Sequence, residues 1–239
     1  MSSNPHHLNS RADPDATVPR TLVERAYLGL RQDVVCGKLA PGERLRVEHL
    51  KDSYGVGAGT LREALSLLVS DALVTSEGQR GFRVAPISMA DLEDVTNTRV
   101  MLETEALRQS IRHGDAQWET TLIQCYEMLT STERDLATAG SDLWELRNKA
   151  FHEALIANFN SSWSKYLLSI LYRHAERYRN INFRLTAAHA SGRDVHQEHE
   201  AIFRAAIARQ EARAALVLEA HIRLTHEVMR QQIGQTAIK

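Results

Sequence analysis

The sequence contains few cysteines, prolines and aromatic residues and carries almost no net charge. Its two cysteines, Cys36 and Cys125, stand far apart in 239 residues and outside any CxxC spacing. A disulfide framework is therefore excluded, and a reducing cytoplasm is the expected compartment. Apolar runs are short, and none approaches the roughly 20 residues that a membrane-spanning helix needs. These absences predict an ordinary globular protein in the cytoplasm, without a membrane partner.

The charge distribution gives no direct sign of a nucleic-acid partner. The net charge is −1, and the parts of the chain on either side of residue 86 are each close to neutral. A DNA-binding surface would therefore have to come from local clustering of basic side chains. Residues 1–20 are polar and lack the apolar core of a secretory signal. They are expected to form a disordered tail.

The segment 21–86 changes from helical to strand-like periodicity. Apolar spacing predicts three helices and then two short strands, over 21–36, 47–54, about 60–71, 73–76 and 81–84. A glycine-rich connection, residues 55–59, precedes the third helix. Thr60 is expected as the N-cap or as a first-turn residue of that helix, and Glu63 three positions later completes a capping-box pattern. Three helices followed by a hairpin predict an N-terminal winged helix-turn-helix domain over residues 21–86.

Everything after Pro86 has helical periodicity. The expected helices cover 90–113, 116–137, 143–159, 163–185, 195–209 and 212–233. Because no strand-like run interrupts them, residues 87–239 predict a helical bundle of six or seven helices. The fold class is thus mainly α, with a winged helix-turn-helix followed by an all-α domain.

A recognition helix must present polar side chains to DNA while its opposite face stays in the core. The third helix and the turns beside it offer such groups. The candidate DNA-binding residues are Arg44, Arg46, Gly57, Thr60, Arg62, Ser66, Arg80 and Gly81. Arg62 is the leading candidate for a phosphate or guanine contact, and Arg80 stands at the tip of the hairpin. The alternative for Arg62 is a solvated side chain that pairs with a nearby glutamate.

The segments LAPGERLR, GTLREALSLLVSDALV and EGQRGFRVAP, taken in order, resemble the winged helix-turn-helix of the GntR family. The helical remainder resembles the FCD domain of the fatty-acid-regulator branch of that family. The resemblance implies a homodimer that binds a palindromic operator and responds to a small ligand in the FCD cavity. Ala58 and Gly59 depart from the family's usual Arg-Thr, so its operator sequence does not carry over. The variant is closer to repressors of the carbon-starvation and glutarate-catabolism type.

Eleven histidines are many for this length, and several fall in the helical region. His152, His199 and His221 have apolar neighbours at helical spacing, which would direct their rings inward. The FCD resemblance implies that these three histidines hold a divalent metal, zinc or nickel, together with Asn148, which stands where the family has Asp. Asparagine can bind a metal through its carbonyl oxygen, but its neutrality lowers the expected affinity. The other histidines there, His174, His189 and His226, are expected to be ordinary core or surface residues.

Arg99 resembles the arginine that meets a carboxylate ligand in the FCD cavity, and its guanidinium fork suits a bidentate grip. The alternative is a surface arginine that pairs with Glu103 at i+4. Further effector-binding candidates are Tyr126, Arg177, Tyr178 and Asn182.

The sequence therefore predicts a non-enzymatic transcriptional regulator, a repressor rather than an activator. Its operator affinity would be controlled by a small carboxylate bound in a metal-containing helical cavity. One alternative is a metal-dependent hydrolase that uses the clustered histidines, although an HExxH motif is absent. Another is an adaptor whose winged helix binds protein.

Overall fold

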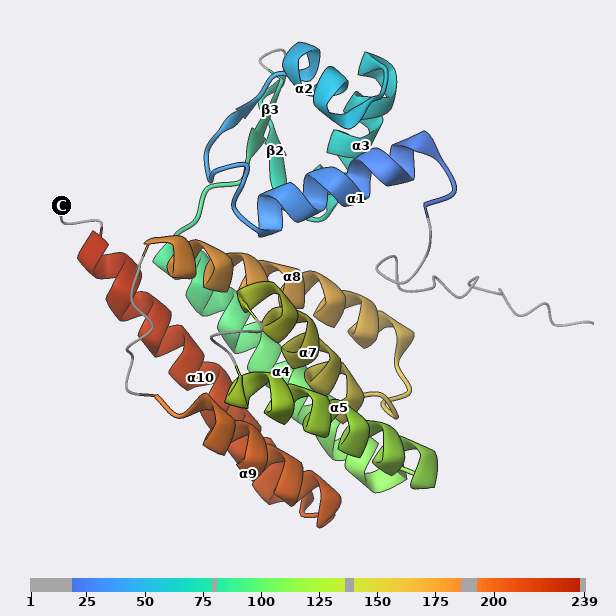
Figure 1. Cartoon of the computed structure of the whole chain (residues 1–239), viewed down its shortest axis with the longest axis vertical. Coiled ribbons are helices and arrows are strands. Elements are labelled where there is room, and N and C mark those ends of the chain that lie inside the picture. The colour runs from blue at the N-terminus through green and yellow to red at the C-terminus, as the bar shows by residue number, and fades with distance from the viewer. Residues whose placement is uncertain (1–18, 79–80, 136–139, 186–192, 237–239) are drawn as a thin grey trace, which may run out of the picture. The chain divides into compact units, whose positions relative to one another are not determined.

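The computed structural model describes residues 19–78, 81–135, 140–185 and 193–236. The chain divides into two compact units between Pro86 and Ile87, and each unit is described by itself. Figure 1 shows the N-terminal unit in blue to green and the helical unit in green to red.

The N-terminal unit contains three helices and a small antiparallel sheet. Its elements are α1 (Leu22–Val35), β1 (Arg44–Leu45), α2 (Val47–Tyr54), α3 (Ala58–Ser70), β2 (Val74–Ser76) and β3 (Phe82–Val84). The strand order is β1-β3-β2, with Leu45 opposite Phe82 and Val74 opposite Val84. This is the winged helix-turn-helix that the sequence predicts.

Local chemistry explains where the first helices begin and end. The Thr21 side chain accepts a hydrogen bond from the backbone N–H of Glu24 and caps α1. Helix α2 ends at Gly55, whose φ of +60° lies in the left-handed region that glycine adopts without strain. Helices α1 and α3 pack together through fully buried leucines, among them Leu30, Leu61 and Leu65.

Two expectations for this unit were wrong. Helix α3 begins at Ala58 with Gly57 as its N-cap and without a side-chain cap, so Thr60 and Glu63 form no capping box. The glycine-rich connection is correspondingly shorter, because Gly59 already lies in the helix. The sequence also failed to indicate β1, since a strand of two residues is too short to show alternating burial.

The helical unit contains six helices in its described part. They are α4 (Met89–His113), α5 (Ala116–Arg134), α7 (Ser141–Leu155), α8 (Ser162–Leu185), α9 (Val195–Ile207) and α10 (Glu211–Thr236). Helix α4 packs against α8 and α10, and α5 packs against α7 and α9. The bundle expected from the sequence is therefore confirmed.

Side-chain caps start three of these helices. Ser88, Asp115 and Asp194 each accept a hydrogen bond from a backbone N–H three residues later, at the starts of α4, α5 and α9. Across the bundle, the Trp118 indole N–H donates to the Ala154 carbonyl at 2.9 Å, which fixes α5 against α7. Buried carbons of α4, α5, α7, α9 and α10 form one continuous core.

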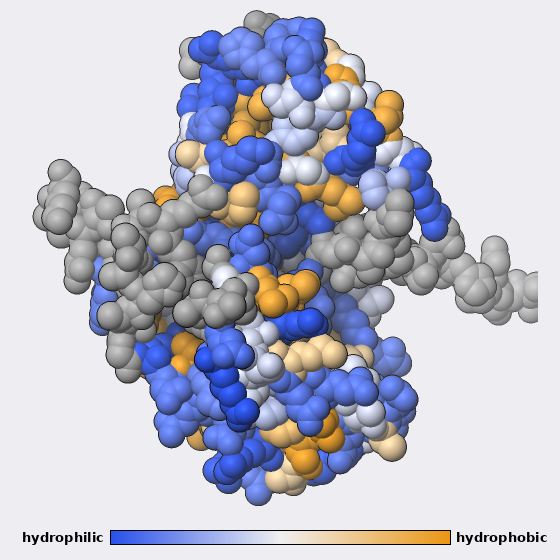
Figure 2. All heavy atoms as spheres, viewed as in Figure 1, coloured by the Kyte–Doolittle hydropathy of each residue, from blue (hydrophilic) through white to orange (hydrophobic). Residues whose placement is uncertain are grey.

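The face drawn in Figure 2 is mostly hydrophilic, with apolar residues scattered over it. Within the described residues, no helix combines the length and apolar character that a bilayer-spanning segment requires.

Leu65→Ala should lower the free energy of unfolding of the winged unit by about 2–5 kcal/mol, because it opens a cavity at a fully buried position. Leu67→Ala on the same helix is the matched control, since Leu67 is 44% exposed. Urea unfolding followed by circular dichroism checks both variants. Equal midpoints for the two would contradict the packing described for α3.

Candidate metal and effector site

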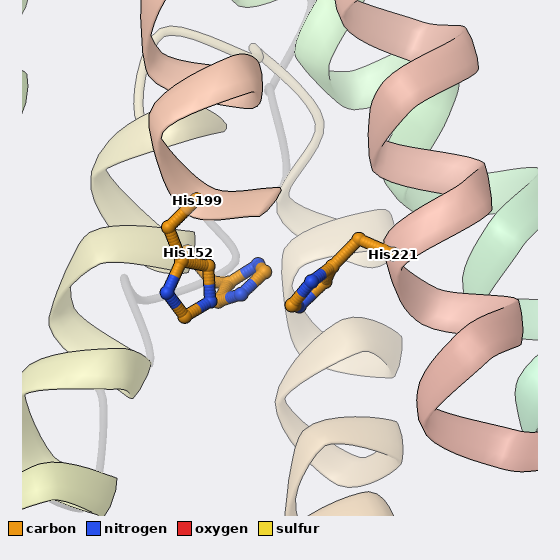
Figure 3. A group of neighbouring side chains, drawn as sticks. All are labelled: His152, His199 and His221. Atoms are coloured by element: carbon orange, nitrogen blue, oxygen red, sulfur yellow. The ribbon is translucent and has the colours of Figure 1, made fainter. Parts of the chain in front are cut away.

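Three histidines from three helices converge inside the helical unit. His152 lies on α7, His199 on α9 and His221 on α10, and all three are buried. One ring nitrogen from each lies within 4.8 Å of the corresponding nitrogen of the other two. Figure 3 shows the three imidazoles facing one another across the space between these helices. Converging imidazoles on rigid elements are an arrangement that suits a transition metal.

Polar atoms around this point are buried without hydrogen-bond partners in the described part of the chain. They include His152 Nδ1, His199 Nε2 and Asn148 Oδ1. Asn148 stands one helical turn before His152 on α7, so both side chains lie on the same face. An unpartnered buried acceptor costs free energy, and a bound cation would satisfy it. The donor set of imidazole nitrogens with one carbonyl oxygen therefore fits a divalent metal such as zinc.

Two of the three imidazole rings contact a glutamate carboxylate through Nδ1. His199 Nδ1 lies 2.7 Å from Glu133 Oε1, and His221 Nδ1 lies 2.8 Å from Glu198 Oε2. Because an ionised carboxylate only accepts hydrogen bonds, His199 Nδ1 carries the proton, and in the neutral ring Nε2 keeps its lone pair. His221 Nδ1 lies between the Glu198 carboxylate and Arg193 Nη2, which is 3.3 Å away. The sequence did not indicate either glutamate, since pairing between α5 and α9 or between α9 and α10 has no local pattern.

Electrostatics also favour neutral rings. Burial is the largest cause that lowers the pKa of His152 and His221 well below 6.5, and the neighbouring histidines and arginines add to it. Neutral imidazole is the form that binds metal. For Glu133, burial works to raise the pKa, but the hydrogen bonds and charges of His199 and His196 outweigh it and lower the pKa below its usual value.

A small cavity of about 20 Å³ lies beside the histidines, with room for about one water molecule. Its lining consists of Arg99, Asn148, Lys149, His152, Tyr172, Glu176 and Arg179. Arg99 is only 7% exposed, so it is not the surface arginine of the alternative interpretation. It nevertheless makes the i+4 contact, with Arg99 Nε 2.6 Å from Glu103 Oε1. Its guanidinium carbon also lies 5.0 Å from the centre of the Tyr172 ring.

The structure places the other effector-binding candidates outside this lining. Tyr126 stacks on Phe203 with 4.0 Å between ring centres. The Tyr178 hydroxyl accepts from the backbone N–H of Ser88 and donates to Asp91, at the start of α4. Arg177 and Asn182 are buried on α8 but do not border the cavity.

The helical period explains why these candidates on α8 do not border the cavity. The lining residues Tyr172, Glu176 and Arg179 follow an i, i+4, i+7 spacing and share one face. Arg177 and Tyr178 are turned away from that face by one or two steps of about 100°. Arg179 is held in place by two hydrogen bonds of 2.8 Å to Glu145.

The remaining histidines have separate surroundings. His174 is buried on α8, and His226 lies 3.6 Å from a Glu227 oxygen. His189 lies outside the described residues. The three-histidine cluster includes neither His174 nor His226.

The DNA-binding candidates lie on α3 and the turns around it. Arg62 and Ser66 are exposed on the same face, and the Ser66 hydroxyl donates to the Arg62 carbonyl at 2.9 Å. Among the described residues, the Arg62 guanidinium forms no hydrogen bond or ion pair, although, after the larger effect of Lys51, its charge contributes to lowering the pKa of Glu48. Gly57 and Thr60 belong to the N-terminal cap and first turn of this helix.

The basic residues of the sheet and wing complete the candidate set. Arg44 lies on β1, and Arg46 precedes α2 as its N-cap; both are exposed. Gly81 begins the approach to β3 with a φ of +91°, whereas Arg80 lies outside the described residues.

A winged helix-turn-helix joined to a helical domain of this kind defines a DNA-binding transcriptional regulator. Residues 22–84 match the family model of the bacterial regulatory proteins of the gntR family, and residues 94–224 match the FCD domain model. The chain belongs to the GntR family and carries an FCD domain, which confirms the resemblance drawn from the sequence.

Characterised and uncharacterised relatives agree with this membership. The chain is 46% identical to the uncharacterized HTH-type transcriptional regulator BphR of Paraburkholderia xenovorans, over 89% of this chain and 86% of that one. It is 33% identical to the HTH-type transcriptional repressor GlaR of Escherichia coli, over 87% and 96%. The solved structure of E. coli McbR/YncC superimposes with a TM-score of 0.74 at 19% identity, covering 89% of this chain and 99% of that one, and shares the fold.

Lowering the pH should destabilise the metal-free protein in a defined range. The folded state keeps His152 and His221 neutral, whereas the unfolded chain binds protons near the ordinary pKa of 6.5. The contribution to stability is therefore complete above pH 6.5 and falls below it, by up to about 1.4 kcal/mol per pH unit for each histidine. Urea unfolding with a chelator present, between pH 7.5 and 5.5, measures this slope.

His152→Asn should reduce the slope, because one of the two histidines is removed. A wild-type slope that the substitution leaves unchanged would contradict the burial argument.

Proposed function

We propose that this regulator is a homodimeric repressor whose operator affinity is set by a small carboxylate bound in the FCD cavity beside a histidine-held metal. The observation that carries the proposal is a cluster of three buried histidines, one of which, His152, lines a cavity together with Arg99 and the unpartnered Asn148 oxygen. The name of the relative GlaR as a repressor supports the direction of control.

The metal would be held by His152, His199, His221 and Asn148, with zinc or nickel as the metals that suit imidazole donors. When bound, it would supply a positive charge that attracts an anionic ligand. All four donors are neutral in this chain, so they leave the charge of the cation uncompensated. This favours an anion as the further ligand.

Arg99 supports a carboxylate as that anion. The Arg99 guanidinium is fixed by Glu103 through Nε and by the face of Tyr172, so its orientation is set before a ligand arrives. Lys149 and Arg179 also belong to this lining, together with Glu176, and they pair with Glu153 and Glu145 respectively. A ligand with two carboxylates could place one near the histidines and the other on Arg99, where a forked contact is strong.

The size of the cavity supports a coupling between ligand binding and helix arrangement. A space of about 20 Å³ holds one water molecule, whereas a dicarboxylate is several times larger. Entry of the ligand therefore requires lining side chains on α4, α7 and α8 to move. Such a change shifts the population between two arrangements of the dimer. Because two half-sites must match the spacing of the two winged units, operator affinity then changes.

Arg62→Ala should weaken operator binding by about 10–100-fold if the side chain reaches a base edge, as a contact worth roughly 1–3 kcal/mol. We expect this loss because the Arg62 guanidinium lies on the exposed face of α3, where it can reach DNA. Fluorescence anisotropy with the DNA upstream of the protein's own gene measures the affinity at several salt concentrations. A loss shared equally by unrelated DNA, with a smaller salt dependence, would instead assign Arg62 to a phosphate.

The matched control is Arg213→Ala, an exposed arginine of α10 in the helical unit. It should leave operator affinity unchanged. Wild-type affinity in Arg62→Ala would contradict the placement of α3 as the recognition helix.

Dicarboxylates should raise the melting temperature of the zinc-treated protein, and Arg99→Ala should abolish the shift. A ligand that binds only the folded state stabilises it according to its affinity and concentration. A thermal-shift screen of dicarboxylates and hydroxy acids, with and without zinc, makes this measurement. Arg108→Ala is the control, because Arg108 is an exposed arginine on the same helix.

A ligand that shifts the wild type and Arg99→Ala equally would contradict the assigned role of Arg99. A ligand that binds but leaves operator affinity unaltered would contradict the regulatory proposal itself.

A further inference from the structure

Glu133 lies near the C-terminal end of α5 and joins two histidines of α9. Its Oε1 lies 2.7 Å from Nδ1 of His199, and its Oε2 lies 2.9 Å from Nδ1 of His196. The carboxylate is almost fully enclosed, with 7% of its side chain exposed. His196 and His199 share one face of α9 because they are three positions apart. Each carboxylate oxygen is therefore occupied by one histidine.

The Glu133 contact determines the tautomer of His199, whose side chain is completely buried. A proton on Nδ1 leaves the lone pair on Nε2, the nitrogen that is buried without a partner beside the other two histidines. The other tautomer would put a proton on the inward nitrogen and leave Nδ1 facing the Glu133 carboxylate without a hydrogen. Glu133 therefore selects the tautomer of His199 and fixes the plane of its ring.

We propose that Glu133 is a positioning residue of the metal site: it touches no metal, but it orients His199 so that Nε2 can bind one. This inference rests on the proposed function, since it needs a metal at the three histidines. Outer carboxylates of this kind raise the basicity of the imidazole as well as aiming it.

His196 helps to hold the Glu133 carboxylate in place. Its side chain is 38% exposed, and it holds the second oxygen of Glu133 while His199 holds the first. This contact keeps the carboxylate from rotating away from His199. The carboxylate that contacts His221 has a different set of partners from Glu133. Glu198 is shared between His221 and the guanidinium of Arg193. Glu133 has histidines alone as its side-chain partners among the described residues, so its removal acts on the metal site most selectively.

Zinc affinity of the full-length protein tests the proposal, measured by competition with a fluorescent zinc chelator. Glu133→Ala should weaken zinc binding by about 10–100-fold, the range seen when outer carboxylates are removed. Glu133→Gln should lie between wild type and Glu133→Ala, because the amide oxygen can still accept from Nδ1 but carries no charge. Glu127→Ala, an exposed glutamate on the same helix, should match the wild type.

The tautomer of His199 gives a readout that a purely structural role would not move. In ¹⁵N-histidine NMR spectra of the wild type, with the ring assigned through His199→Asn, Nδ1 should carry the proton both with and without zinc. A proton on Nε2 in the metal-free wild type would overturn the proposal, even if the Glu133 variants failed to fold.

Different results would disprove the metal site and the role of Glu133. Wild-type protein that binds no zinc would overturn the proposed metal site and this inference together. Zinc binding that His199→Ala abolishes, with equal affinities for wild type, Glu133→Ala and Glu127→Ala, would overturn the role of Glu133 alone.

Discussion

The helical unit holds three imidazoles close together in a buried place. His152, His199 and His221 come from α7, α9 and α10, so their meeting point ties together helices that are distant in sequence. Contacts of two of the rings with Glu133 and Glu198 extend this connection to α5 and join α9 to α10 a second time. Desolvation lowers the pKa of His152 and His221, and buried nitrogens of His152 and His199 have no hydrogen-bond partner. A cation at this point would therefore bind where the helices converge, and a change there would reach several of them at once.

The fold could be predicted from sequence wherever periodicity is long or a motif is specific. The helices after Pro86 and the LREAL helix of the winged unit follow apolar patterns of more than ten residues, and the structure confirms them. The sequence-based predictions failed at two short features. The two-residue strand β1 shows no alternation, and Gly57 rather than a polar side chain precedes α3. Propensity gives no signal at either place, because tertiary packing decides the outcome.

For the site, the sequence supplied residue types but not the facing directions of distant helices. The three histidines and Arg99 were identified from a family resemblance. The structure clusters the three histidines and places His152 and Arg99 in the lining of one cavity. Glu133 could not be identified, because its contact with His199 joins residues 66 positions apart on different helices. On α8 the candidates Arg177, Tyr178 and Asn182 do not line this cavity, whereas Tyr172, Glu176 and Arg179 share one face at i, i+4 and i+7 and do line it.

The central claim is that occupancy of this cavity and operator binding are coupled, and thermodynamic linkage requires that coupling to be reciprocal. The most direct measurement is the affinity of a carboxylate effector for the zinc-loaded dimer, by calorimetry, with and without saturating operator DNA. The account predicts weaker effector binding in the presence of operator, by the same factor by which the effector weakens operator binding. Identical effector affinities in the two titrations would contradict it.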